Sequence, residues 1–262
     1  MSEFFALFEY SIYASFLLAV AIAIAGSIML ITRSSYIAAS LAHGSYGGVG
    51  LAIFLGTPIL ATTLGFALTL ALLLAWITLK NPTRKDLIIG TIWAVGMSLG
   101  ILFIDLAPGY NTDLLAYLFG NILLIAKEDL LLLLITDLIL LLVIAVFYNH
   151  ILAVAYDPDF AKVRGVRVGF IHTLTILLLA LAVIASIRAV GLILVIALFS
   201  IPPFIAEKLA KNMVQMIVIS ALLALLFLGA GLAASYTFNV SATAATILAA
   251  ATGFILSLKG KP

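Results

Sequence analysis

The sequence predicts an all-α integral membrane protein, a polytopic bundle of about nine transmembrane helices, in a range of eight to ten. Of its 262 residues, 65% are hydrophobic and only 9% are charged, whereas soluble domains are about 45–50% apolar and ~25% charged. Several apolar runs have the length of about 20 residues that a helix needs to cross a bilayer. Because lipid offers backbone amides no partner, these runs must be helical, and the alternating pattern of membrane strands is absent.

Polar residues, glycines and prolines interrupt the apolar sequence and divide it into nine candidate helices. The first, 8–31, has Glu3 and Glu9 before or at its start and no basic residue. It is also longer than the apolar region of a signal peptide, so we expect it to be retained as a span. The other eight are expected at 40–56, 59–79, 87–106, 129–149, 170–187, 189–204, 213–234 and 240–258. Residues 1–262 are therefore expected to form a single transmembrane domain.

The placement of lysine and arginine predicts the orientation of the chain. Nine spans put the two termini on opposite sides of the membrane. If the C-terminus is cytoplasmic, all of the 13 basic residues except Lys127 and Arg188 fall in inner segments. We therefore expect the N-terminus outside and the C-terminus in the cytoplasm. Cysteine is absent, which excludes disulfides, thiolate metal sites and cysteine nucleophiles.

The charged segment, residues 157–167, carries five charged side chains between the fifth and sixth spans. Asp157 can cap a helix whose first residue is Pro158, and Asp159 then lies near the positive end of the helix dipole. Gly165 suits the C-terminal stop. The pattern predicts a two-turn helix in the cytoplasm, and a solvated loop is the alternative.

A second short segment, 113–124, is apolar but too short to span a membrane, and a glycine lies within it. Its position between the fourth and fifth spans puts it on the outer side. We expect a short helix at the outer mouth of the bundle.

Two polar side chains within spans are candidate pore residues. His43 lies near the start of the second span, where an intramembrane histidine is often functional and neutral imidazole is a good ligand for zinc and similar metals. Asp137 lies near the middle of the fifth span, where a buried charge costs at least ~2.5 kcal/mol and needs a partner or a wet cavity. A pore ligand, a structural hydrogen bond and a helix contact all remain open for Asp137. The glycines around His43 indicate close helix packing.

The charged segment resembles the coupling segment of ABC-importer permeases, in which an acidic, a small and a glycine residue precede a basic stretch and a new span. Further stretches follow in family order from about residue 30 to 216. They are Arg33-Ser-Ser-Tyr36, Leu41-Ala-His-Gly-Ser45, Thr112-Asp-Leu-Leu-Ala-Tyr-Leu-Phe-Gly-Asn121, Glu128-Asp129, Val190-Gly-Leu-Ile-Leu-Val195 and Ile201-Pro-Pro203. The chain thus resembles the permease subunit of metal-type ABC importers, the zinc, manganese and iron group, whose fold is similar to that of cobalamin and siderophore permeases.

The resemblance implies a homodimeric pore for a divalent metal, zinc or manganese, in the plasma membrane of a prokaryote. It also implies two cytoplasmic ATPase subunits docked at 155–168 and an extracytoplasmic substrate-binding protein. The sequence agrees, because it contains no Gly-x-x-x-x-Gly-Lys-Ser/Thr phosphate loop. ATP is therefore expected to be used by a partner. The chain itself is expected not to be an enzyme, to bind no cofactor and to have no nucleic-acid partner.

The resemblance also assigns residues. The ATPase-coupling residues are Asp157, Asp159, Ala161, Lys162, Arg164, Gly165 and Arg167. The outer-gate residues are Tyr117, Phe119, Gly120 and Asn121. His43 matches a metal-path histidine, but the family usually has an aspartate one turn earlier, where this chain has Ala39. Asp137 is a candidate to replace that missing carboxylate.

Two other functional classes are alternatives to an importer permease. An ion-coupled secondary transporter would use Asp137 and His43 as a proton relay and bind no ATPase. An intramembrane protease is disfavoured, because no His-Glu-x-x-His motif or cysteine occurs and Asp137 lacks a second aspartate at mid-depth.

Overall fold

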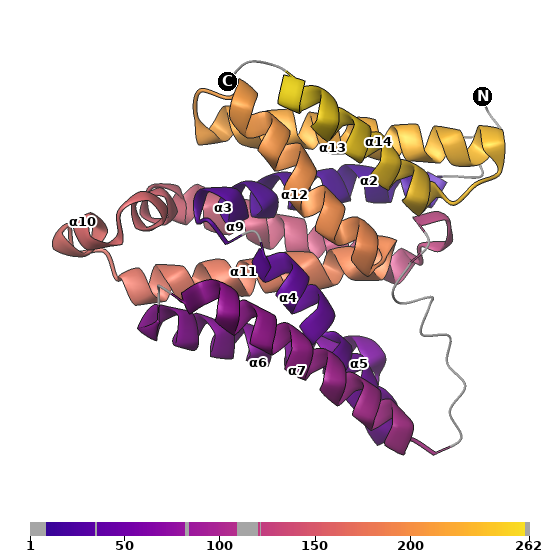
Figure 1. Ribbon diagram of the computed structural model, residues 1–262, viewed down its shortest axis with the longest axis horizontal. Coiled ribbons are helices and arrows are strands. Elements are labelled where there is room, and N and C mark those ends of the chain that lie inside the picture. Colours follow the sequence, from indigo (N-terminus) through magenta and orange to yellow (C-terminus); the bar gives the residue numbers. More distant parts are fainter. Residues whose placement is uncertain (1–8, 35, 82–83, 109–119, 121, 260–262) are drawn as a thin grey trace. The chain divides into compact units, whose positions relative to one another are not determined.

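The computed structural model describes residues 9–34, 36–81, 84–108, 120 and 122–259 (Figure 1). Every regular element in these ranges is a helix. Among them, eight helices are long and apolar enough to cross a membrane, and a ninth, Ala242–Leu258, is apolar but shorter. The predicted all-α membrane fold is confirmed, and each of the nine candidate helices has a counterpart.

The chain divides into two compact units. Unit 1 comprises Met1–Leu30, Leu114–Leu142 and Ala185–Pro262, and unit 2 comprises Ile31–Asp113 and Val143–Ile184. The elements that supply residues to unit 1 are α2 (Glu9–Ala21), η1 (Ile22–Gly26), α3 (Ser27–Ile31), η3 (Ile122–Leu124), α9 (Lys127–Tyr156), α11 (Val168–Val190), α12 (Leu192–Leu209), α13 (Met213–Phe238) and α14 (Ala242–Lys259). Those in unit 2 are α4 (Tyr36–Gly44), α5 (Tyr46–Leu55), α6 (Ile59–Lys80), α7 (Lys85–Leu106) and α10 (Pro158–Val163), together with parts of α9 and α11.

In unit 1, α12 packs against α13, α14 and the π-helical turn η1. A Cβ added at Gly26, the last residue of η1, would lie 2.6 Å from Cγ of Pro203 and 2.8 Å from the carbonyl oxygen of Phe199. The first spanning helix therefore meets α12 so closely that no side chain fits at Gly26, which is the close approach that small residues permit in membranes. Phe199 is almost fully buried at this contact.

In unit 2, four glycines form a close contact between helix backbones, which we call the glycine seam. They are Gly44 on α4, Gly50 on α5, and Gly96 and Gly100 on α7. A Cβ added at Gly96 would lie 2.5 Å from Cα of Gly44, and one added at Gly50 would meet the backbone of Gly100. The prediction that the glycines around His43 serve close packing is confirmed for Gly44 and Gly50.

Several helix boundaries differ from the predicted ones, and two of the differences have a clear local cause. The fifth span was expected to end at residue 149, but α9 continues to Tyr156 over 30 residues. Polar side chains at 149 and 150 do not break a helix, and the first residue that does is Pro158. The seventh span was expected at 189–204, but it starts after Gly191, whose φ is +82°. That left-handed backbone suits glycine and separates α11 from α12.

Candidate functional site

The helix predicted within the charged segment is present as α10 (Pro158–Val163), so the loop alternative is wrong. The Asp157 carboxylate accepts a hydrogen bond of 2.8 Å from the backbone N–H of Phe160 and caps the helix. Gly165 has a φ of +81°, and the N–H of Val166 donates to the carbonyl of Ala161. Local sequence alone therefore determines where this helix starts and stops.

α10 presents apolar side chains outward. Ala161 is fully buried, whereas Phe160 is 52% and Val163 is 87% exposed. Arg164 covers part of the Phe160 ring, with 5.1 Å from Cζ to the ring centroid. Exposed aromatic and aliphatic groups among charges are typical of a surface that a protein partner covers. Sequence reasoning assigned the charged residues here and missed Phe160 and Val163, whose apolar character within a polar helix was the available signal.

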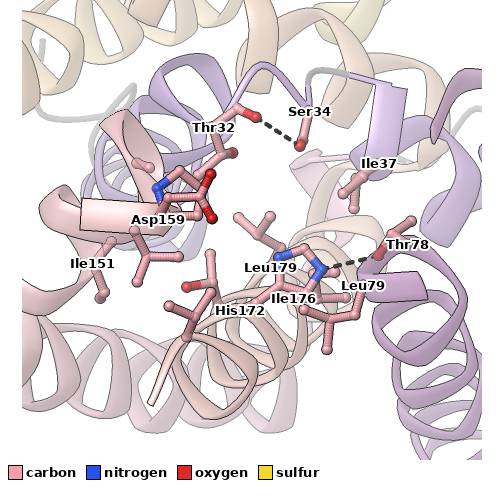
Figure 2. Close-up of a pocket in the computed structure, with 15 residues that line it drawn as sticks. Thr32, Ser34, Ile37, Thr78, Leu79, Ile151, Asp159, His172, Ile176 and Leu179 are labelled. Carbon is pink, nitrogen blue, oxygen red and sulfur yellow. Dashed lines mark hydrogen bonds between the residues drawn. The ribbon is translucent and has the colours of Figure 1, made fainter. Parts of the chain in front are cut away.

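A cavity of about 450 Å³ lies in unit 2 beside α10. Figure 2 shows Asp159 of α10 and His172 of α11 facing it. Nε2 of His172 is 2.9 Å from the Oγ1 of Thr78 on α6. Residues of α9 and of the connection 32–37 complete the wall. α10 therefore shares the wall of this cavity with the ends of α6, α9 and α11.

His43 lies in the last turn of α4 and stacks on Trp93 of α7. The ring centroids are 4.1 Å apart and the ring planes differ by 9°. Nδ1 of His43 is buried and has no hydrogen-bond partner among the described residues. One turn earlier, the methyl group of Ala39 is buried at the position where a carboxylate would be expected. No sequence pattern singles out Trp93.

Asp137 lies on the buried face of α9 and is 3% exposed. Neither of its carboxylate oxygens has a hydrogen-bond partner in the described part of the chain, and the Oγ1 of the adjacent Thr136 also lacks one. Buried polar groups are nearly always paired, so these three atoms require an explanation. Asp137 belongs to unit 1 and His43 to unit 2.

No cluster of three or more His, Cys, Asp or Glu side chains that could hold a metal ion occurs among the described residues. The described residues thus form no closed coordination cage.

The outer segment 113–124 lies mostly outside the described residues, including Tyr117, Phe119 and Asn121. Gly120 is described and has a φ of +57°. A Cβ added at Gly120 would collide with the backbone of Val190 and Gly191. The carbonyl of Ile122 accepts a hydrogen bond of 2.9 Å from the hydroxyl of Ser11. The end of the segment is therefore held tightly within unit 1.

An ion pair lies close to this anchored segment in sequence. Asp129, in the first turn of α9, accepts hydrogen bonds from Nε and Nη2 of Arg188 at 3.0 and 2.7 Å. The sequence placed Arg188 and Lys127 on the outer side but did not predict the pairing of Arg188 with Asp129.

Comparison with known proteins identifies the family. The sequence pattern of the ABC 3 transport family matches residues 5–261. An uncharacterized membrane protein of Synechocystis is 36% identical over 248 residues, which cover 95% of this chain and 88% of the relative. The manganese transport system membrane protein MntC of Listeria monocytogenes is 27% identical over 90% of this chain and 84% of the relative. The manganese import system permease protein ScaB of Streptococcus gordonii is 28% identical, covering 88% and 83%.

Solved structures agree. PsaBC from Streptococcus pneumoniae, solved in complex with Fab, matches with a TM-score of 0.83 and 28% identity over 97% of this chain and 91% of that chain. An inward-facing metal-chelate type ABC transporter matches with a TM-score of 0.74 and 19% identity, over 95% and 84%, which shows a shared fold.

These matches confirm the resemblance drawn from the sequence and do not favour a secondary transporter. The chain is a multi-pass plasma-membrane protein with the architecture of a transport pore. It belongs to the ABC 3 transport family, as a permease subunit of an ABC transporter.

Proposed function

We propose that this chain forms, as a homodimer, the membrane pathway of an ATP-driven importer for a divalent metal ion. Manganese is the first candidate and zinc the second. The observation that carries the proposal is the similarity over nearly the full length to MntC and ScaB, two proteins named for manganese transport.

ATP hydrolysis takes place on a separate chain, which docks on α10. The supporting geometry is the capped helix with Ala161 packed inward and Phe160 and Val163 exposed. The charged residues Asp159, Lys162, Arg164 and Arg167 surround this apolar contact and orient the partner. Motion of the ATPase then reaches α6, α9 and α11 through the walls of the cavity beside α10 and alternates access to the pore.

The orientation follows from charge: α10 and the C-terminus are cytoplasmic, and the segment 113–124 lies outside as a gate. An extracytoplasmic binding protein delivers the metal to this side. Gly120 supports the gate assignment, because its tight contact with Gly191 anchors one end of the segment.

The metal passes His43 and Asp137, each a single protein ligand in its own unit. Imidazole and carboxylate together suit first-row divalent metals, with imidazole favouring zinc and carboxylate favouring manganese. Since Ala39 supplies no carboxylate, Asp137 is the hard ligand of the pathway. Its unpartnered oxygens support that role.

The test is uptake of ⁵⁴Mn²⁺ into proteoliposomes that contain this chain with its ATPase and its binding protein. ATP enclosed at the cytoplasmic face should drive uptake, and a proton gradient alone should not. Val163→Asp should reduce both ATPase co-purification and uptake, because it puts a charge in the apolar contact. The control Val240→Asp, at another exposed valine in the connection before α14, should leave both unchanged. Uptake driven by protons without ATP would refute the proposal.

A further inference from the structure

Trp93 covers one face of the His43 imidazole. The 4.1 Å separation and 9° angle describe a parallel stack. The lone pair of an imidazole nitrogen lies in the plane of the ring, so a neighbour stacked on the face does not compete with a ligand at the edge. The stacked indole does restrict the rotation of the imidazole that would move its ligand-binding edge. The stack thus sets the direction in which a ring nitrogen points and leaves it free to bind.

Two contacts fix the indole itself. Gly44 follows His43 directly, Gly96 lies one turn after Trp93, and the close approach of these glycines brings α4 against α7. The indole Nε1–H donates a hydrogen bond of 3.2 Å to Sδ of Met97, one turn along the same helix. Backbone packing therefore brings the two rings together, and the thioether sets the tilt of the indole.

We infer that Trp93 is a positioning residue of the metal pathway: it holds the His43 imidazole in the plane that receives a divalent cation, and Met97 orients Trp93. This inference rests on the proposed role of His43 as a ligand. The torsion that turns an imidazole is broad and roughly two-fold. Without the indole, only a fraction of ring orientations binds the cation, and the apparent dissociation constant rises by the inverse of that fraction.

The chain contains its own reporter, because Trp76 and Trp93 are its only tryptophans. Trp76 lies on α6 beneath the ammonium group of Lys80 and has no part in the proposed pathway. Trp76→Phe should leave uptake unchanged and make Trp93 the single tryptophan. Titration of this full-length chain in detergent with MnCl₂ should give saturable quenching of Trp93 fluorescence. Adding His43→Ala should abolish the saturable component.

Equilibrium dialysis with ⁵⁴Mn²⁺ separates positioning from general damage. Trp93→Leu should weaken binding by about 2- to 10-fold, the range expected for loss of an aromatic pair. Trp93→Phe retains a ring and should restore most of the affinity. Met97→Leu removes the sulfur acceptor at nearly constant volume and should weaken binding by about 2-fold.

The outcomes distinguish failure of the positioning role of Trp93 from failure of the proposed metal path. If the parent chain binds no Mn²⁺, or binds it equally well after His43→Ala, His43 is not a ligand and the proposed metal path is wrong. If binding depends on His43 while both Trp93→Leu and Met97→Leu bind as tightly as the parent, the positioning role is overturned and the path stands. If Trp93→Leu fails to fold, Met97→Leu and the quenching titration decide alone. The inference is then contradicted if Met97→Leu binds Mn²⁺ with an unchanged dissociation constant and Mn²⁺ does not quench the fluorescence of Trp93.

Discussion

Asp129 and Asp137 lie on the same buried face of α9, yet their surroundings differ. Asp129 is paired with Arg188 through two hydrogen bonds, whereas Asp137 has no partner within the described chain. Burial is therefore a poor guide to function by itself. Removing one partner of a buried ion pair destabilises the fold, while a buried carboxylate without a partner must be neutralised or compensated by a group that is not among the described residues.

The largest expected effect is on stability, from substitution of Asp129, the carboxylate that is paired with Arg188. Asp129→Asn should lower the free energy of unfolding in detergent by about 2–4 kcal/mol. This is less than the ~3–5 kcal/mol of a fully buried pair, because the Arg188 side chain is 30% exposed. A double-mutant cycle with Arg188→Gln isolates the pair from other effects of either change. Additive free energies in that cycle would show that the ion pair contributes nothing.

Substitution of Asp137, the carboxylate without a partner among the described residues, should have the opposite effect on stability. Asp137→Asn should leave the free energy of unfolding unchanged or raise it by up to ~1–2 kcal/mol, since no interaction is lost. ⁵⁴Mn²⁺ uptake should fall by about 10- to 100-fold. The exposed Asp105 at the end of α7 provides a matched control, because Asp105→Asn makes the same chemical change outside the proposed pathway. Normal uptake by Asp137→Asn, or a large loss of stability, would make Asp137 a structural residue.

A rescue experiment tests whether Asp137 replaces the carboxylate missing at Ala39. In the Asp137→Asn background, Ala39→Asp should raise ⁵⁴Mn²⁺ uptake by at least about 3-fold, equivalent to ~0.6 kcal/mol. Ala39→Ser in the same background is polar but lacks a carboxylate and should not rescue. If both substitutions act alike, or neither does, the two positions do not share a role.

The smallest effect concerns Thr136, whose hydroxyl is buried without a partner beside Asp137. Thr136→Val keeps the shape and removes the hydroxyl, so the free energy of unfolding should rise by about 0.5–1 kcal/mol at constant uptake. Chemical denaturation in micelles measures the first quantity and proteoliposomes the second. A drop in stability would instead reveal that water or another group bonds to this hydroxyl, and the surroundings of Asp137 would then be wet.

The sequence predicted the features that depend on neighbouring residues. Nine apolar helices follow from composition and length, and α10 follows from a cap, a proline and a glycine within nine positions. The end of α9 differs from the predicted one because the polarity of Asn149 does not stop a helix, which ends where its hydrogen bonding is interrupted.

Contacts between distant residues could not be predicted in this way. Asp129 and Arg188 are 59 positions apart, and both were visible only as isolated charges. The stack of His43 on Trp93 depends on how closely α4 approaches α7, which is set by Gly44 and Gly96 together. A single sequence shows that glycines permit close contact but not which glycines meet.

The glycine seam has a consequence for how the transporter moves. Backbone atoms of α4 and α5 touch those of α7 so closely that no methyl group fits between them, and interlocked backbones resist sliding past each other. The helices joined by the seam should therefore travel as a single rigid piece during each transport cycle. His43 and its indole then keep one local geometry whether the pathway opens outward or inward. If His43 binds the ion as proposed, release must come from groups that approach or leave this piece, and the imidazole need not turn away from the ion.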